Sequence, residues 1–306
     1  MSYIIYSVCG RLELQPGANI LAHEHIMVDF IGADKTGPER WDRAAVIARM
    51  LPYLQALHDQ NINLFFDCTP NYLGRDPVLL RDLSQRSGIQ IVTNTGLYKD
   101  QYIPAWGRTA SVDELAARWI AEYTDGIEGT DIRPGFIKTA VNPGPLNEEA
   151  RRCIRAAAVC SRETGLTVAT HCGDAVASHQ ILDILESEGV PPEKWILVHS
   201  QLVQNDDELL GVAARGPFIE LDGLAWGDYE NHATKLRRLV DGGYANRTLL
   251  SQDAGWYHVG EENGGEVIGY TALIGKFLPY ATPAVAPDIL ETIMTRNPLE
   301  AYAIRR

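Results

Sequence analysis

The chain has 306 residues, a length that a single (β/α) barrel domain covering residues 1–306 accounts for. With 45% hydrophobic and 22% charged residues, its composition is that of an ordinary globular protein. It carries 27 Lys and Arg against 40 Asp and Glu, and this net charge of −13 argues against nucleic acid or an anionic membrane surface as a partner.

The first residues, MSYIIYSVCGRLEL, have no basic segment ahead of their short apolar run, so we expect no signal peptide. No apolar stretch reaches the ~18 residues that a membrane-spanning helix requires. The five cysteines are odd in number and have no CxxC spacing. Such cysteines predict reduced thiols and a cytoplasmic location.

After a short N-terminal β-hairpin, an apolar run followed by a helical pattern recurs eight times. The expected strands cover residues 20–29, 63–69, 89–98, 134–141, 166–172, 195–200, 218–223 and 247–255. The expected helices cover residues 43–60, 76–88, 111–126, 147–165, 175–189, 205–216, 230–243 and 266–279, with a last helical stretch over 287–304.

Strands that alternate with helices predict a parallel sheet, and eight repeats predict its closure into a (β/α)8 TIM barrel. Asp76, Ser111 and Asn147 stand where helix N-caps are expected. No glycine-rich phosphate loop follows any of the expected strands, which argues against a nucleotide-binding sheet.

Six polar residues interrupt the apolar strands, most of them at the C-terminal end, where the active sites of TIM barrels lie. They are His23 and His25 in AHEH, Lys138 in FIKT, His171 in ATHC, His199 in LVHS and Asp253 in SQDAG. Each alone has an ordinary interpretation, as a hydrogen-bonded histidine, a helix cap or a salt-bridged rim lysine. Six together on five strands favour a metal site.

The residue types indicate which metals this site would hold. Imidazole and carboxylate groups suit zinc and related divalent ions, with Mn, Co or Fe as alternatives. Lys138 is the exception, because an ammonium group has no lone pair and would be repelled by a cation. If CO2 or bicarbonate carboxylated it to N6-carboxylysine, Lys138 would become an anion able to bridge two metal ions.

At these residues the chain resembles the phosphotriesterase family of the amidohydrolase superfamily. The resemblance runs from GRLELQPGANILAHEH to IMTRNPLEAYAI and includes NYLGRDPVLLRDLSQRSGIQIVTNTGLY and GPFIELDG. It implies that His23, His25 and Asp253 bind a buried metal ion and that His171 and His199 bind a more exposed one. Carboxylated Lys138 and a hydroxide would bridge the two ions, and the family also suggests a homodimer.

The resemblance implies a hydrolase in which the bridging hydroxide attacks the substrate and Asp253 accepts its proton. Two positions depart from the founding phosphotriesterases, which carry a proton relay after strands six and seven. Leu202 and Gly223 stand there in this chain, and neither can carry a proton. Gly223 also departs from the arginine of many lactonases.

Several residues are candidates for substrate contacts. Tyr98 in TGLY matches a tyrosine beside the metals in lactonases and could orient the substrate or support the leaving oxygen, or simply pack at the barrel mouth. Trp226, Trp256 and His258 could line the entrance, and Lys99, Arg75 and Arg108 could meet an anionic substrate. His58, His179 and His232 fall in helical stretches and are expected to be exposed.

The predicted function is hydrolysis of a small molecule, a lactone or carboxylic ester, accompanied by weak phosphotriesterase activity. The alternatives are an amidase acting on an N-acyl compound and a genuine organophosphate triesterase. A mononuclear deaminase would leave Lys138 without a role, and a binding barrel without catalysis would not explain all six residues.

Overall fold

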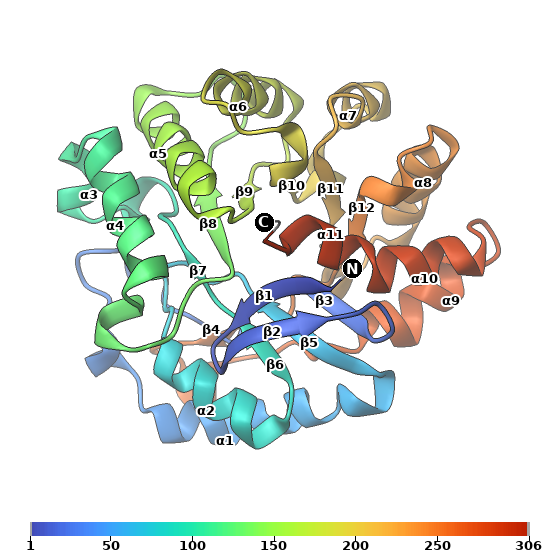
Figure 1. The fold of residues 1–306 in the computed structure, drawn as a ribbon. Helices are drawn as coiled ribbons and strands as arrows, with labels where there is room; N and C mark the ends of the chain where they lie inside the picture. The colour runs from blue at the N-terminus through green and yellow to red at the C-terminus, as the bar shows by residue number, and fades with distance from the viewer. Residues whose placement is uncertain (1, 305–306) are drawn as a thin grey trace.

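In the computed structural model, which describes residues 2–304, the strands form the predicted (β/α)8 barrel (Figure 1). Two parallel ladders make up its wall, in the orders β12-β11-β10-β9-β8-β7 and β3-β5-β6. The strands are β3 (Asn19–Glu24), β5 (Ile62–Asp67), β6 (Gln90–Val92), β7 (Asn94–Thr95), β8 (Phe136–Ala140), β9 (Val168–His171), β10 (Trp195–Val198), β11 (Phe218–Leu221) and β12 (Thr248–Leu250).

The barrel closes between the first and last strands by hydrogen bonds at their C-terminal ends. The backbone N–H of His23 donates to Ser251 Oγ at 2.9 Å, and the N–H of Asp253 donates to the carbonyl of His23 at 3.1 Å. The third predicted strand is divided into β6 and β7 at Thr93, whose carbonyl accepts the N–H of Gly135. The closure therefore places two of the predicted site residues beside each other.

Helices surround the barrel (Figure 1). They are α1 (Arg43–Gln55), α2 (Pro77–Ser87), α3 (Ala105–Thr109), α4 (Val112–Thr124), α5 (Glu148–Thr164), α6 (Ala175–Ser187), α7 (Asp206–Ala213), α8 (Tyr229–Asp241), α9 (Leu278–Ala281), α10 (Pro287–Thr295) and α11 (Asn297–Tyr302). The three predicted N-caps are confirmed, since each side chain accepts a backbone N–H of the first turn. The helix predicted over 266–279 is wrong in its first half, because regular structure starts only with the π-helical turn η10 (Leu273–Phe277).

Alternation along the strands divides the core into two parts. Leu21, Phe65 and Ile137 belong to the larger cluster, which also contains the buried faces of the helices. Ala22, Phe66 and Phe136 belong to a second cluster inside the barrel. This division leaves the interior at the C-terminal end of the barrel for the polar residues.

The N-terminal hairpin, β1 (Tyr3–Ser7) paired antiparallel with β2 (Gly10–Leu14), is confirmed. Ile5 and Tyr302 of α11 pack into the cluster inside the barrel, and Ile4 and Ile304 form a bridge. Figure 1 shows the hairpin and α11 crossing the centre of the ring of helices. They close the end of the barrel opposite the predicted site.

The sequence also made predictions about the cysteines and about membrane-spanning helices. All five cysteines are free, in agreement with the prediction of unpaired thiols. Among the helices of residues 2–304, none combines the length and the hydropathy that a membrane crossing requires.

Candidate metal centre

The six predicted ligands come together at the C-terminal end of the barrel. The ring centroid of His23 lies 5.5 Å from that of His25 and 5.2 Å from that of His199. The ring centroids of His171 and His199 are 4.5 Å apart. Lys138 Nζ lies 3.3 Å from His23 Nε2, and Asp253 Oδ1 lies 3.2 Å from His25 Nε2. The histidines and carboxylates form two groups compact enough for a cation, His23 with His25 and Asp253, and His23 with His199 and Asp222.

The four imidazoles share one orientation, in which Nδ1 is held by a hydrogen bond. His23 Nδ1 contacts Glu220 Oε2 at 3.0 Å, and His199 Nδ1 contacts Asp222 Oδ1 at 2.7 Å. His171 Nδ1 contacts the hydroxyl of Tyr98 at 3.0 Å. Since metal-binding histidines almost always have one nitrogen occupied in this way, Nε2 is the nitrogen available to a metal.

His25 allows the proton to be placed by counting donors. The hydroxyl of Thr69 donates its only hydrogen to the carbonyl of Met27 at 3.0 Å. It must therefore accept the hydrogen of His25 Nδ1, which lies 2.7 Å away. The lone pair of His25 is then on Nε2, facing Asp253.

Burial keeps two of these imidazoles neutral, as a metal ligand must be. It lowers the pKa of His23 to about 3, with Lys138 adding to the effect. It also lowers the pKa of His171 well below its ordinary value, helped by His199. At His199 burial acts in the same direction, but Asp222 outweighs it and raises the pKa, so this site favours positive charge on or beside the ring.

The two aspartates of the centre differ in what they offer a cation. Asp222 is fully engaged, because it accepts from the His199 ring, from the His199 backbone N–H and from Gln201 Nε2. Asp253 Oδ1 is buried and has no hydrogen-bond donor among residues 2–304. Burial acts to raise the pKa of Asp253, but the surrounding imidazoles of His25, His199 and His23 outweigh it and lower the pKa, so the carboxylate is ionised. The donor set therefore fits divalent cations, with Asp253 as the ligand and Asp222 as the orienting group.

Lys138 is as unusual as the sequence indicated. Its side chain is buried, with 2% of its surface exposed. Its hydrogen-bonding contact within the described chain is His23 Nε2. An ammonium group has three hydrogens to donate, so a buried one with a single partner is poorly satisfied.

The backbone at the centre departs from regular geometry. His199 and Asp253 both adopt positive φ, at 59° and 53°, a region that costs a non-glycine residue energy. Gly96, at φ 117°, lets the end of the third strand approach Lys138, since a Cβ there would lie 2.1 Å from the Lys138 carbonyl oxygen. Such strain at the positions that carry ligands is typical of a functional site.

Glu24 stabilises the backbone next to the centre. Its carboxylate accepts hydrogen bonds from Ser251 Oγ and from the backbone N–H groups of Gln252 and Ala254. Burial raises the pKa of Glu24 to about 8, although these donors act against the shift. Glu24 thus ties the first strand to the segment that carries Asp253.

The predicted substrate-contact residues form an aromatic rim beside the ligands. The Trp256 ring lies 4.3 Å from that of His25, and its Nε1 donates to the Asp253 carbonyl at 2.7 Å. Trp226 Nε1 donates to the same carbonyl at 3.1 Å, although 62% of the residue is exposed. His258 lies parallel to the Trp256 ring, with centroids 6.2 Å apart, and exposed Phe30 stacks on Trp256.

The positions that depart from the phosphotriesterase relay remain without a proton carrier. Leu202 is 54% exposed, and Gly223 has no side chain. The prediction that His232 is exposed is wrong, because it is 2% exposed. Its Nδ1 contacts the carbonyl of Asp228, and its ring lies 6.3 Å from that of Phe277. A Cβ at Gly223 would meet Gln201 Nε2 at 2.7 Å, so the glycine leaves room for Gln201.

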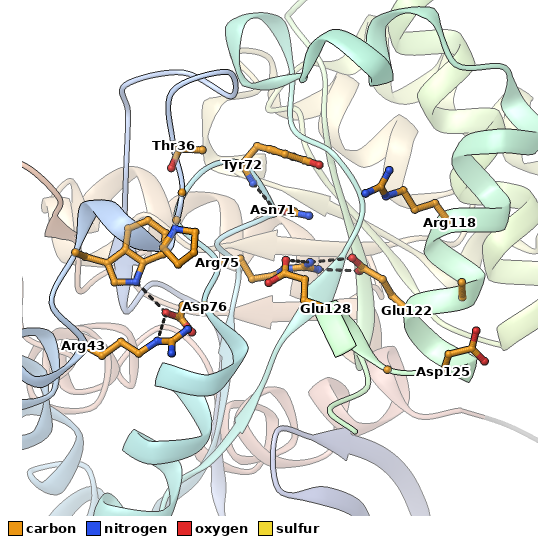
Figure 2. A pocket seen from close by; sticks show the side chains of 16 residues that line it. Thr36, Arg43, Asn71, Tyr72, Arg75, Asp76, Arg118, Glu122, Asp125 and Glu128 are labelled. Carbon is orange, nitrogen blue, oxygen red and sulfur yellow. Dashed lines mark hydrogen bonds and ion pairs between the residues drawn. The ribbon is translucent and has the colours of Figure 1, made fainter. Parts of the chain in front are cut away.

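Of the three predicted rim cations, Arg75 lies elsewhere. It forms the floor of a groove of about 510 Å3 between the loop before α2 and helix α4, and none of the six predicted ligands lines this groove. Figure 2 shows Arg75 and Glu122 pointing towards each other, with Glu128 beside them. Arg75 also donates to the carbonyl of Asn94, whose side chain donates to the carbonyl of Thr69. Arg75 therefore supports the segment that holds His25.

Comparison with known proteins agrees with this geometry. The model of the phosphotriesterase family matches residues 5–302. The chain belongs to the phosphotriesterase family. It is a metal-dependent hydrolase, as the members of this family are.

The individual relatives share less than a third of their residues with this chain. The phosphotriesterase homology protein of Escherichia coli is 29% identical over 88% of this chain and 91% of its own. The aryldialkylphosphatase of Saccharolobus solfataricus is 28% identical over 76% of each chain, and the N-acetyltaurine hydrolase of Mus musculus is 28% identical over 96% of each. A mutant organophosphorus hydrolase from Deinococcus radiodurans superimposes with a TM-score of 0.87, at 25% identity, over 98% of this chain and 97% of its own.

The sequence patterns had not identified Glu220 and Asp222 as the groups that orient His23 and His199. Their signal was present, because FIELDG places two carboxylates two residues apart and so on one face of a strand. Thr69 and Gln201 had no comparable signal. Both act through contacts with segments distant in the sequence.

The hydrogen bond of Thr69 generates a first prediction. We expect Thr69→Val to weaken metal binding about 10- to 100-fold, because His25 Nδ1 loses its acceptor and the ring its orientation. The measurement is metal content per chain after equilibration against a graded series of chelator concentrations. Thr93→Val is the matched control, since Thr93 is equally buried but its hydroxyl has no hydrogen-bond partner in residues 2–304. Equal metal affinity of the two variants would contradict the orienting role.

Proposed function

We propose that this chain hydrolyses lactones or carboxylic esters of small molecules with the help of two divalent metal ions, with weak phosphotriesterase activity as a side reaction. One observation carries the proposal. Four histidines with Nδ1 engaged, the Asp253 Oδ1 without a hydrogen bond and the poorly satisfied Lys138 lie together at one end of the barrel. This set has no evident structural purpose without cations.

The proposed assignment gives each cation its own ligands. His23, His25 and Asp253 would hold the more buried ion, since they form one compact group. His171 and His199 would hold the other, and Lys138, carboxylated by CO2 or bicarbonate, would bridge them. Nitrogen and oxygen donors of this kind suit zinc first, with manganese, cobalt or iron as alternatives.

When bound, such ions lower the pKa of a coordinated water and polarise the carbonyl oxygen of a substrate. The chain supplies the remaining steps. Ionised Asp253 accepts the proton that the attacking water releases, through the carboxylate oxygen that does not hold the ion. The indole N–H groups of Trp226 and Trp256 both bind the Asp253 carbonyl and so fix this residue.

Tyr98 is the proposed proton donor to the leaving oxygen, and solvent at the barrel mouth then takes the proton from Asp253 and returns one to the Tyr98 phenolate. Burial and the nearby Asp253 raise the pKa of its phenol, so the hydroxyl keeps its proton at neutral pH. It lies 3.0 Å from His171 Nδ1, within reach of a substrate bound at the metal ligands. The aromatic rim of Trp226, Trp256 and His258 offers flat apolar surfaces to the rest of the substrate.

The preference for esters over phosphotriesters follows from the two relay positions. At these positions exposed Leu202 and buried Gly223 offer Asp253 no proton carrier. The aryldialkylphosphatase relative keeps a triesterase as an alternative. A second candidate is amide hydrolysis of an N-acyl compound, which the near full-length match to relatives named N-acetyltaurine hydrolase favours. A homodimer and a cytoplasmic location stay predictions, the first to be tested by the mass of the protein in solution.

The role of Lys138 is tested by removing it. We expect Lys138→Ala to lose both metal ions and activity, because the bridging anion disappears. The measurements are metal stoichiometry and turnover after reconstitution with zinc, with and without bicarbonate. Exposed Lys276→Ala serves as the control. A Lys138→Ala protein that keeps two metals and wild-type turnover would exclude the carbamate.

The role of Tyr98 is tested with two leaving groups. We expect Tyr98→Phe to slow an alkyl ester about 10- to 100-fold and a 4-nitrophenyl ester little, because only the poor leaving group needs a proton. Metal stoichiometry should be unchanged. If Tyr98 serves only to orient His171, both esters will slow alike and metal affinity will fall. Tyr102→Phe, whose ring packs against Tyr98, is the control.

The class of substrate is tested by a screen of the zinc-loaded protein against matched lactones, esters, N-acyl amino compounds and phosphotriesters. We expect kcat/KM for the best lactone or ester to exceed that for the best phosphotriester by at least about tenfold. Turnover of N-acyl compounds alone would replace the ester assignment by the amidase. Absence of turnover on the whole panel by protein that holds two metals would contradict the proposed function.

A further inference from the structure

Lys99 is the predicted rim cation that lies beside the metal centre. Arg75 is fixed in the groove described above, and Arg108 is exposed and donates to the Asp100 carbonyl. Lys99 is half-buried and follows Tyr98 directly. Its Nζ lies 5.8 Å from the centroid of the Tyr98 ring, and the same ring lies 5.3 Å from the ring of His171. One phenol ring therefore separates the ammonium group from a proposed metal ligand.

The ammonium group of Lys99 is incompletely neutralised. Its hydrogen bond goes to a neutral acceptor, the carbonyl of Val141, at 3.2 Å. It forms no ion pair with a carboxylate of residues 2–304. The nearest acidic influence is Asp100, but both oxygens of Asp100 accept from Asn142 Nδ2, at 3.0 and 3.2 Å. Lys99 therefore keeps donors that a ligand could use.

Burial adds an energetic reason for a ligand at this position. It lowers the pKa of Lys99, since the charged form is less solvated than in water, and Asp100 offsets the effect only in part. A half-buried cation without a counter-ion is costly, and a bound anion would remove much of that cost.

The space beside Lys99 limits the size of the anion. A cavity of about 40 Å3 lies beside Lys99, the cation of its lining, and Asp100, Asn142 and Glu149 also line it. Asp100 is already engaged by Asn142, and a space of this size suits a group of a few heavy atoms such as a carboxylate. The cavity shares Tyr98 with the metal centre, but none of the six predicted ligands lines it, so a substrate that reaches both has to pass the Tyr98 ring.

We propose that Lys99 binds a carboxylate of the substrate, so that the preferred substrates are small esters or lactones with a carboxylate a few bonds from the scissile carbonyl. This inference rests on the proposed function, because it names the substrate class of the same site. The single intervening ring of Tyr98 sets the short distance between the two groups. Lys99 selects the substrate and takes no part in bond breaking.

Specificity kinetics test the proposal directly. The substrates are 4-nitrophenyl hemisuccinate, which carries a free carboxylate, and its neutral methyl ester. We expect the ratio of kcat/KM for the anionic ester to that for the neutral ester to fall about tenfold in Lys99→Met, since a charge-assisted hydrogen bond is lost. The change should be in KM. Lys99→Arg should retain most of the ratio, and exposed Lys276→Met should retain all of it.

A binding measurement makes the test independent of turnover. Titration of the zinc-loaded protein with succinate should give a Kd about tenfold weaker for Lys99→Met than for wild type. Acetate, whose single carboxylate binds at the metals, should have the same Kd in both proteins. Equal succinate affinity in wild type and Lys99→Met would overturn the inference, as would an unchanged kcat/KM ratio.

The two proposals fail in different ways. If neither ester is hydrolysed but succinate binding depends on Lys99, the ester assignment fails and the carboxylate site stands. If both esters are hydrolysed with the same preference in all variants, the proposed function stands and Lys99 is only a solvated rim residue.

Discussion

The centre depends on one kind of interaction, the hydrogen bond that holds Nδ1 of a buried imidazole. Asp222 holds His199 and contacts His23, Thr69 holds His25, and Tyr98 holds His171. Without these partners, a buried imidazole could rotate or take a proton on either nitrogen. With them, each ring presents Nε2 to one shared space. Because the partners come from the ends of three different strands, the barrel has to be closed before the ligand set exists.

The fold provides this closure by departing from regular strand geometry where the ligands lie. Ala22 packs inside the barrel, and strict alternation would turn His23 outward. The register between β3 and β5 shifts between Leu21 and Glu24, and His23 also faces the interior, near Lys138. Positive φ at His199 and Asp253 likewise redirects side chains at strand ends. The strain is supported by a well-packed barrel, whose lower end the hairpin and α11 fill.

The sequence predicted the barrel and the six ligands because the signals for both are local. Eight apolar runs with helical patterns between them define a barrel, and polar residues at the ends of those runs mark its active face. What it could not predict depends on three-dimensional neighbours. His232 is buried through contacts with distant residues such as Phe277, whose ring lies 6.3 Å away. Arg75 lies in a groove away from the ligands because acidic residues of α4 and its following turn hold it there. The register shift in β3 has no signature in AHEH.

The distribution of charge connects the centre with its substrate. The folded chain is strongly acidic overall, yet the mouth of the barrel contains two lysines, Lys138 and Lys99. Two dications would carry four positive charges, and Asp253, Asp222, a carbamate at Lys138 and a bridging hydroxide would carry four negative ones. The centre would then be close to neutral, so the positive charge left to act on a substrate would be that of Lys99. A neutral substrate would gain little from this ammonium group, whereas a carboxylate would be held by it. Activation of water by the metals and selection of an anionic ester by Lys99 are therefore tasks of separate groups.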